Sequence, residues 1–361
     1  MAATLAQLKH LLDTQGENSQ IFSLGNGASL LIWEDRGRIY GPFFGEDSEG
    51  MLWVPQALSS AKAFQDFRQS GQWNAGGDRL WIAPEFPFFT KERAHFNESY
   101  TVQDSLDPGH YHFLPSSDGR LVFSAQLSAQ LYEHQFTQKS FTMTRSLEVC
   151  ENPLRFCKDL ASLMMRIDYC GYTHAIDLTD TSPEFPMELE IWNLCQVRAG
   201  GTFLIPYLGD QFEYVDYYAP SMGKVLSVHP GVASIHVASA AEHKVGAKAF
   251  QTFGRVGYLL PCGDGVWQLL IRNYYNNPSD PYIKDPSDRP GENGCSLFVY
   301  MNDTRGDGFA ELESTGETFC APEKCSSHLD LNHWFFRGSL ADLQPIAKRL
   351  LNVDIMQEGL L

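Results

Sequence analysis

The chain has 361 residues, of which 43% are hydrophobic and 20% are charged, and this composition excludes a disordered protein. Its 27 Lys and Arg against 44 Asp and Glu give a formal net charge of −17, which disfavours nucleic acids and anionic membranes as partners. No apolar run approaches the roughly 20 residues of a membrane span. The eight cysteines include no CxxC pair and the N-terminus shows no signal-peptide pattern, so we expect buried thiols and a cytoplasmic location.

Short runs rich in β-branched and aromatic residues alternate with Gly, Pro, Asn and Asp along most of the chain, whereas helical periodicity is rare. In chain order we predict a helix over Thr4–Leu12, strands over Ser29–Trp33 and Gly37–Phe43, a helix over Ala57–Gln69, strands over Leu121–Ala125, Ser140–Leu147, Thr202–Pro206, Ser234–Val237, Val266–Asn273, Cys295–Met301 and Phe309–Ser314, and a helix over Leu340–Leu351. This pattern favours an all-β sandwich or barrel with a few peripheral helices.

Two features refine these elements. The last helix has a candidate N-cap at Ser339, and Pro345 lies in its first turns, where it could move the start later. The segment Asn276–Asn293 is the most turn-rich part of the chain, and we expect a long surface loop there. Long loops in compact domains are often functional.

Sequence motifs for common cofactors are missing. There is no GxxxxGK[ST], GxGxxG, GxSxG or HExxH pattern, so we expect no cofactor and no metal. His110 and His112 would share one face of a strand and could ligate a metal, but no third ligand can be named. We interpret them as loop or surface residues and keep them as candidates for binding a substrate.

The segment Trp73–Glu85, WNAGGDRLWIAPE, gathers residues that suit carbohydrate recognition. An indole such as Trp81 can stack on the apolar face of a sugar, and Asp78, Arg79 and Glu85 can bind its hydroxyl groups. The alternative is a core tryptophan beside an Asp–Arg ion pair at a sheet edge. A similar choice exists at Glu190–Pro206, where Trp192 and Gln196 either line a cleft or are strand residues at a sheet crossing.

Two carboxyl groups occur close together near the C-terminus. In a strand over the sequence DGFAELESTG, Glu311 and Glu313 point to the same face as Phe309, while Leu312 points the other way. If the pair is partly desolvated, one carboxyl pKa should rise towards the range of a general base. The alternative is a solvated outer face of the sheet.

With these segments in place, the chain resembles the galactose-mutarotase-like superfamily, and within it the uncharacterised bacterial branches more than the aldose 1-epimerases. The resemblance runs from about Ile21 to Gly338. Its parts occur in this order: a GR turn at Arg36–Ile39, GG-x-R-x-W-x-x-P-E at Gly76–Glu85, a strand with an arginine at Thr142–Arg145, W-x-x-x-Q-x-x-x-GG-x-x-x-x-P at Trp192–Pro206, the region Lys244–Tyr258, and FAELE at Phe309–Glu313.

The resemblance implies a β-supersandwich of two large antiparallel sheets with a cleft for carbohydrate, over residues 21–338, between an N-terminal helix in residues 1–20 and a C-terminal helix and tail in residues 339–361. It implies that a glutamate on a late strand is the general base, for which Glu313 matches better and Glu311 is the second candidate. The epimerase histidines have no clear counterpart, although His174 lies near the expected place of one. Arg79 could stabilise an anion in place of an acid, and Tyr258 is a candidate proton donor.

Three functions follow from this resemblance. The first is a sugar isomerase or epimerase that moves a proton at or next to the anomeric carbon. The second is a carbohydrate-binding module without catalysis. The third is lyase or hydrolase chemistry, in which Arg79 and Arg272 would neutralise a uronate carboxylate. The expected partner in each case is a mono- or oligosaccharide; the sequence leaves open whether the chain is an enzyme, and does not indicate an oligomeric state.

Overall fold

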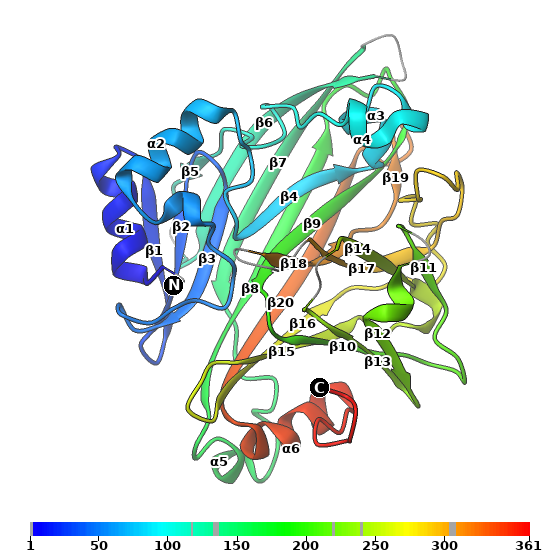
Figure 1. Ribbon diagram of the computed structural model, residues 1–361. Helices are drawn as coiled ribbons and strands as arrows, with labels where there is room; N and C mark the ends of the chain where they lie inside the picture. The colour runs from blue at the N-terminus through cyan, green and yellow to red at the C-terminus, as the bar shows by residue number, and fades with distance from the viewer. Residues whose placement is uncertain (1–2, 117, 133–136, 219–220, 239–240, 303–307) are drawn as a thin grey trace.

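The computed structural model describes residues 3–116, 118–132, 137–218, 221–238, 241–302 and 308–361. Within these ranges, twenty strands form two antiparallel sheets of ten strands each (Figure 1). The first sheet contains, in spatial order, β1 (Ser19–Gly25), β2 (Ala28–Trp33), β3 (Arg38–Phe44), β4 (Asp78–Ala83), β9 (Glu188–Arg198), β18 (Phe309–Thr315), β17 (Cys295–Met301), β14 (His243–Lys248) and β11 (Tyr214–Asp216), with β19 (Phe319–Cys320) paired to β9.

The second sheet contains, in spatial order, β12 (Leu226–His229), β13 (Val232–His236), β10 (Thr202–Pro206), β15 (Arg255–Pro261), β16 (Val266–Tyr274), β20 (Ser326–Ser339), β8 (Asp168–Asp180), β7 (Thr137–Val149), β6 (Leu121–Leu131) and β5 (His112–Leu114). The α-helices in the described ranges are α1 (Leu5–Thr14), α2 (Ala61–Ser70), α3 (Glu85–Phe89), α4 (Phe96–Ser99), α5 (Leu160–Leu163) and α6 (Leu340–Leu351); the 3-10 turns there are η1 (Gln56–Leu58), η2 (Arg93–His95), η3 (Met222–Lys224) and η4 (Ala249–Gln251).

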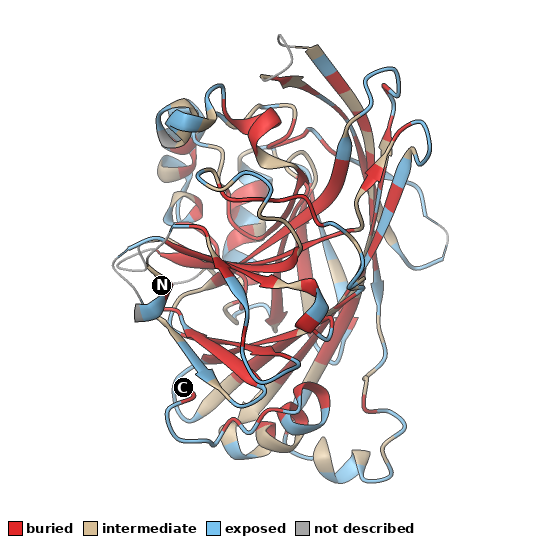
Figure 2. Cartoon of the chain, turned by 90° about the vertical axis from the view of Figure 1, so that its right-hand side faces the viewer, coloured by how far each residue is buried: buried red, intermediate tan, exposed pale blue. Residues whose placement is uncertain are grey.

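The two sheets enclose the main hydrophobic core. Side chains alternate across each strand, so Leu312 of β18 and Cys195 of β9 point inward, where they join Phe141 of β7 and Ile176 of β8 in one buried cluster. Figure 2 shows buried residues along the strands of both sheets. We call the side of the first sheet that points away from the second sheet its outer face.

Helices cover parts of the outer surfaces. Apolar residues of α1 and α2, including Leu8 and Phe64, pack with Trp33 of β2 in a second cluster, so these two helices cover the outer face at β1–β3 (Figure 1). At the other side of the molecule, α6 packs with Leu343 and Ile346 against Leu269 of β16 and covers the second sheet. Loops and short helices cover the outer face of the first sheet between β4 and β14.

The predicted all-β sandwich with peripheral helices is confirmed. Several predicted elements were too short, because strands such as β7 continue through alternating polar residues that the apolar pattern does not mark. The strands β8 and β20 were not predicted at all, although they are 13 and 14 residues long. The second predicted helix begins only at Ala61, since the Ser60 hydroxyl accepts a hydrogen bond from the Ala63 amide and caps it there.

The C-terminal helix has its predicted bounds. The Ser339 hydroxyl accepts a hydrogen bond from the Asp342 amide, which confirms the N-cap, and Pro345 lies inside the helix without moving its start. The turn-rich segment at 276–293 contains no regular element, but it is not wholly a surface loop, because Tyr282 and Lys284 are buried. Among the described residues, none of the helices is long and apolar enough to cross a membrane.

Candidate functional site

Polar side chains gather on the outer face of the first sheet at β4, β9, β18 and β17. The strand register places Glu311 of β18 opposite Gln196 of β9 and Tyr300 of β17. Glu313 lies two residues further along β18 on the same face, while Leu312 between them belongs to the core. The prediction that the two carboxyl groups share one face is therefore confirmed.

Glu311 is held by two side-chain donors from neighbouring strands. Arg79 Nη2 of β4 donates to Glu311 Oε1 at 2.8 Å, and Gln196 Nε2 of β9 donates to the same oxygen at 2.7 Å. Glu311 is 4% exposed and Glu313 is 0% exposed, so the alternative of a solvated outer face is wrong. Burial raises the pKa of Glu311, the Arg79 guanidinium opposes the rise, and the nearby Glu313 adds to it.

Glu313 has a different pair of partners. Lys244 Nζ of β14 donates to Glu313 Oε1 at 2.9 Å, and Trp192 Nε1 of β9 donates to Glu313 Oε2 at 2.8 Å. The Lys244 ammonium also lies 4.9 Å from the centre of the Trp192 ring. Burial opposes the charge on Lys244, but Glu313 and Glu85 raise its pKa above the ordinary value. The two glutamates therefore lie side by side in different electrostatic surroundings.

A second ion pair borders the same tryptophan. The loop after β16 brings Lys284 to within 3.9 Å of the Trp192 ring centre, and its ammonium group is paired with Glu85 at the start of α3. Tyr100 Oη donates to the other oxygen of Glu85 at 3.2 Å. Burial alone would raise the pKa of Glu85, but Lys284 and Lys244 hold it below its usual range. Burial lowers the pKa of Lys284.

Asp107 connects the tryptophans to the arginines. Its carboxylate accepts hydrogen bonds from Arg38 Nη2 at 2.7 and 2.8 Å and from Trp81 Nε1 at 3.1 Å, and it lies 3.6 Å from Arg79 Nη1. The Arg79 guanidinium lies 4.1 Å from the Trp81 ring centre and 4.5 Å from that of Trp73. Trp81 is buried among these groups, so its indole positions Arg79 and Asp107.

The glycines before β4 bring this strand into place. Gly76 and Gly77 have φ values of 78° and 69°, and a Cβ on either would meet the backbone oxygen of Trp53 or Ile39 at 2.5 or 2.6 Å. Only glycine fits such a close approach at positive φ. The two glycines therefore allow a close backbone approach here, and Arg79 follows two residues later.

The inner face of the same strands carries a separate charged network between the sheets. Asp78 of β4 lies 3.1 Å from Arg145 Nη2 of β7 and 3.5 Å from Arg272 Nη2 of β16. Each arginine also donates its Nε hydrogen to a histidine, Arg145 to His174 at 3.0 Å and Arg272 to His333 at 3.1 Å. Burial lowers the pKa of both histidines well below the ordinary value, so they are neutral acceptors.

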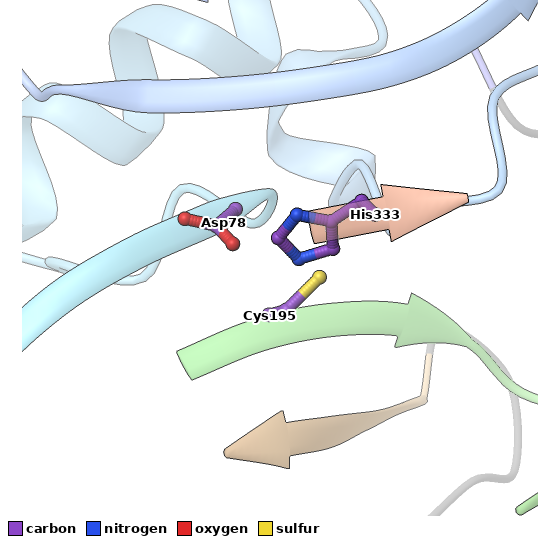
Figure 3. A group of neighbouring side chains, drawn as sticks. All are labelled: Asp78, Cys195 and His333. Atoms are coloured by element: carbon purple, nitrogen blue, oxygen red, sulfur yellow. The ribbon is translucent and has the colours of Figure 1, made fainter. Parts of the chain in front are cut away.

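Asp78, Cys195 and His333 each bring one donor atom to within 4.8 Å of the others (Figure 3). These are metal-ligand residue types, but two guanidinium groups already lie on Asp78, and a divalent cation there would face both positive charges. The charge balance favours an ion-pair network over a metal site. The alternative of an Asp–Arg ion pair at a sheet edge is therefore wrong, because β4 lies between β3 and β9 and Asp78 pairs with arginines of the second sheet and not with Arg79.

The structure brings together Glu311, Glu313, Arg79, Trp81, Trp192, Gln196 and Glu85 from the predicted site. It places Asp78 and Arg272 on the other side of the sheet. Tyr258 of β15 donates to the backbone oxygen of Arg198 and accepts from the Gly201 amide, away from the glutamates. His110 is exposed between Asp35 and Asp104, and His112 is exposed at the edge strand β5.

Several residues of this site were missed in the sequence. Lys244 lies in the Lys-Val-Gly stretch that the resemblance included, but nothing in its neighbours marked it as a partner of Glu313. Lys284 lies in the turn-rich loop, whose length was the only signal of a function. Asp107 and Arg38 come from segments far apart in the chain, and only the fold joins them.

Residues 44–358 match the profile of a family described as "Family of unknown function (DUF6786)". The chain belongs to the DUF6786 family. No curated protein sequence matches this DUF6786 chain. Among solved structures it is similar to a galactose mutarotase-like protein from Lactobacillus casei, with a TM-score of 0.50 and 9% identity over 88% of this chain and 100% of that one.

A second similar structure is an aldose epimerase homologue from C. elegans, with a TM-score of 0.41 and 8% identity over 90% of this chain and 99% of that one. The Lactobacillus casei structure and the two ten-stranded sheets show that this DUF6786 chain has the galactose-mutarotase-like fold that the resemblance predicted. Identities this low describe the fold alone.

Proposed function

We propose that the protein binds a neutral sugar on the outer face of the first sheet and catalyses proton transfer at its anomeric centre, as a sugar isomerase of the mutarotase type. The observation that carries this proposal is the pair Glu311 and Glu313, two carboxyl groups on one strand face in different electrostatic surroundings. Carboxyl pairs whose surroundings differ in this way commonly divide into an acid and a base.

Glu313 is the base in this proposal. Lys244 Nζ and Trp192 Nε1 donate to its two carboxyl oxygens, which lie on the same strand face as Glu311, and there Glu313 accepts the proton of the anomeric hydroxyl. Glu311, whose pKa is raised by burial, is the acid that gives its proton to the ring oxygen. The carbon–oxygen bond of the ring then breaks, the aldehyde forms, and closure on the other face returns both protons.

Arg79 and Gln196 have a defined part in this step. When Glu311 loses its proton, both groups already donate to its Oε1 and stabilise the carboxylate that forms. This arrangement supplies an acid where the epimerase histidines are missing. Tyr300, directly across the strand pair from Glu311 and half-buried, is the aromatic surface on which we place the sugar ring.

A neutral substrate follows from the pairing of charges. Arg38 and Arg79 both lie on the carboxylate of Asp107, Lys244 is paired with Glu313, and Lys284 is paired with Glu85. A uronate or phosphate would have to displace one of these buried carboxylates from its cation, and separating a buried ion pair is costly. A neutral sugar needs no such displacement. The lyase alternative lacks one expected contact, because Arg272 of β16 lies between the two sheets and contacts Asp78 there.

The test is exchange NMR of the two anomers of neutral aldoses with the wild type, Glu313→Gln, Glu311→Gln and, as control, Glu148→Gln on the exposed side of β7. For one aldose we expect accelerated exchange that either site variant slows about 100-fold or more and the control leaves unchanged. Sugar signals that shift on binding without faster exchange would replace the isomerase by a carbohydrate-binding module. No binding of any sugar would refute both.

A further inference from the structure

A groove of about 880 Å³ opens on the outer face of the first sheet, next to the helical cover. The exposed face of α1 forms one wall and the turn η1 with the start of α2 forms the other, and these helices lie side by side in Figure 1. Trp53, Arg198 and Gly308 form its inner end. A volume in this range is typical of ligand sites.

The inner end of the groove lies close to the strand that carries the glutamates. On β18, Phe309 lies two residues before Glu311 on the same face, about 7 Å away along the strand. Phe309 pairs with Arg198, the groove residue at the end of β9, and its ring stacks on Trp53 with centres 4.5 Å apart. The row of side chains Glu313, Glu311 and Phe309 therefore leads from the proposed reaction site to the groove.

The lining of the groove suits uncharged polyhydroxyl ligands. Apolar surface from Trp53, Pro55 and Leu11 alternates with hydroxyl and amide side chains, among them Thr4, Thr14, Gln7, Gln56, Ser59 and Ser60. Its charged residues Arg198 and Glu49 are paired with each other at 3.0 Å. Sugars present both apolar C–H faces and hydroxyl groups, so this mixture matches a glycan better than an anion or a purely apolar ligand.

We propose that this groove binds further units of a neutral oligosaccharide whose reducing-end unit lies at Glu311 and Glu313. The proposal rests on the proposed function and names its substrate class. The direction follows from the chemistry, because proton transfer at an anomeric hydroxyl needs a free one, and only the reducing-end unit carries it. The remaining units then extend past Phe309 and Trp53 between α1 and α2.

The experiment titrates the protein with gluco-, manno-, galacto- and xylo-oligosaccharides of one to five units, followed by calorimetry. In at least one series we expect the trisaccharide to bind at least tenfold more tightly than the monosaccharide. His10→Trp, which fills the groove from the exposed face of α1, and Arg198→Ala should remove this gain without changing the affinity for the monosaccharide. Lys62 is an exposed residue of α2 that does not line the groove. Lys62→Trp is therefore the matched control and should keep the tighter binding of the trisaccharide.

The outcomes separate the two proposals. If a monosaccharide binds and its anomers exchange, but longer members gain nothing or the gain survives in His10→Trp and Arg198→Ala, the groove proposal fails and the isomerase stands. If longer oligosaccharides bind more tightly, and His10→Trp and Arg198→Ala remove this gain, but no anomer exchange is accelerated, the groove binds glycan and the isomerase proposal is refuted. If no member of any series binds, both proposals are overturned.

Discussion

At the scale of single residues, buried charges of opposite sign lie together on both faces of the first sheet. On the outer face each of the site's carboxyl groups lies on a cation, and on the inner face Asp78 faces both Arg145 and Arg272. Removing one partner from such a group leaves a buried charge without compensation, which costs more than the pair itself contributes. Asp78 is therefore the most sensitive position of the inner network.

We expect Asp78→Asn to lower the free energy of unfolding by about 3–5 kcal/mol, because two buried guanidinium groups lose the carboxylate that they share. Urea unfolding of the variant and the wild type measures this difference. Asp118→Asn, which breaks an exposed pair with Arg120, is the control and should change the stability by less than about 1 kcal/mol. A similar loss in both variants would contradict a special role of the inner network.

At the scale of elements, local signals succeeded where one residue performs a local task. The N-cap Ser339 begins α6 because its hydroxyl satisfies the Asp342 amide, and the sequence shows this without any knowledge of the fold. Local signals failed for β8 and β20, whose alternating polar residues resemble loop sequence. These strands form because they pair with each other over twelve positions in the second sheet.

We expect Ser339→Ala to destabilise the protein by about 1 kcal/mol, because the first turn of α6 loses its cap while the apolar contacts of the helix with the second sheet remain. Thermal unfolding measures the change. Ser326→Ala, at the exposed start of β20, serves for comparison and should have little effect. An unchanged melting temperature for Ser339→Ala would show that packing alone holds the start of this helix.

At the scale of the whole molecule, Glu190 of β9 ties the loop that carries Lys284 to the first sheet. Its Oε1 accepts from the Ile283 amide at 2.6 Å and from the Thr318 hydroxyl at 2.7 Å, in a fully buried place. Burial raises the pKa of Glu190 from 4.5 to about 8. The folded state thus holds this proton more tightly than the unfolded state, and its contribution to stability is complete below pH 4.5.

That contribution is lost as the pH rises from 4.5 to about 8, by at most about 1.4 kcal/mol for each pH unit. We therefore expect the stability of the wild type to fall more steeply over this interval than that of Glu190→Gln, which keeps an acceptor oxygen and does not ionise. Denaturant unfolding at pH 5, 6.5 and 8 measures the two slopes. Glu188→Gln, exposed on the same strand, should follow the wild type, and parallel slopes for Glu190→Gln would refute the assignment.

The sequence alone determined the fold class, the N-cap of α6, and the common face of Glu311 and Glu313. These follow from turn chemistry, capping and the two-residue period of a strand, all of which act between near neighbours. Tertiary structure decided which cation each carboxyl group meets. Strand order and the paths of loops bring Lys244, Lys284 and Asp107 to the site. Packing between the two sheets places Asp78 and Arg272 against each other in the interior.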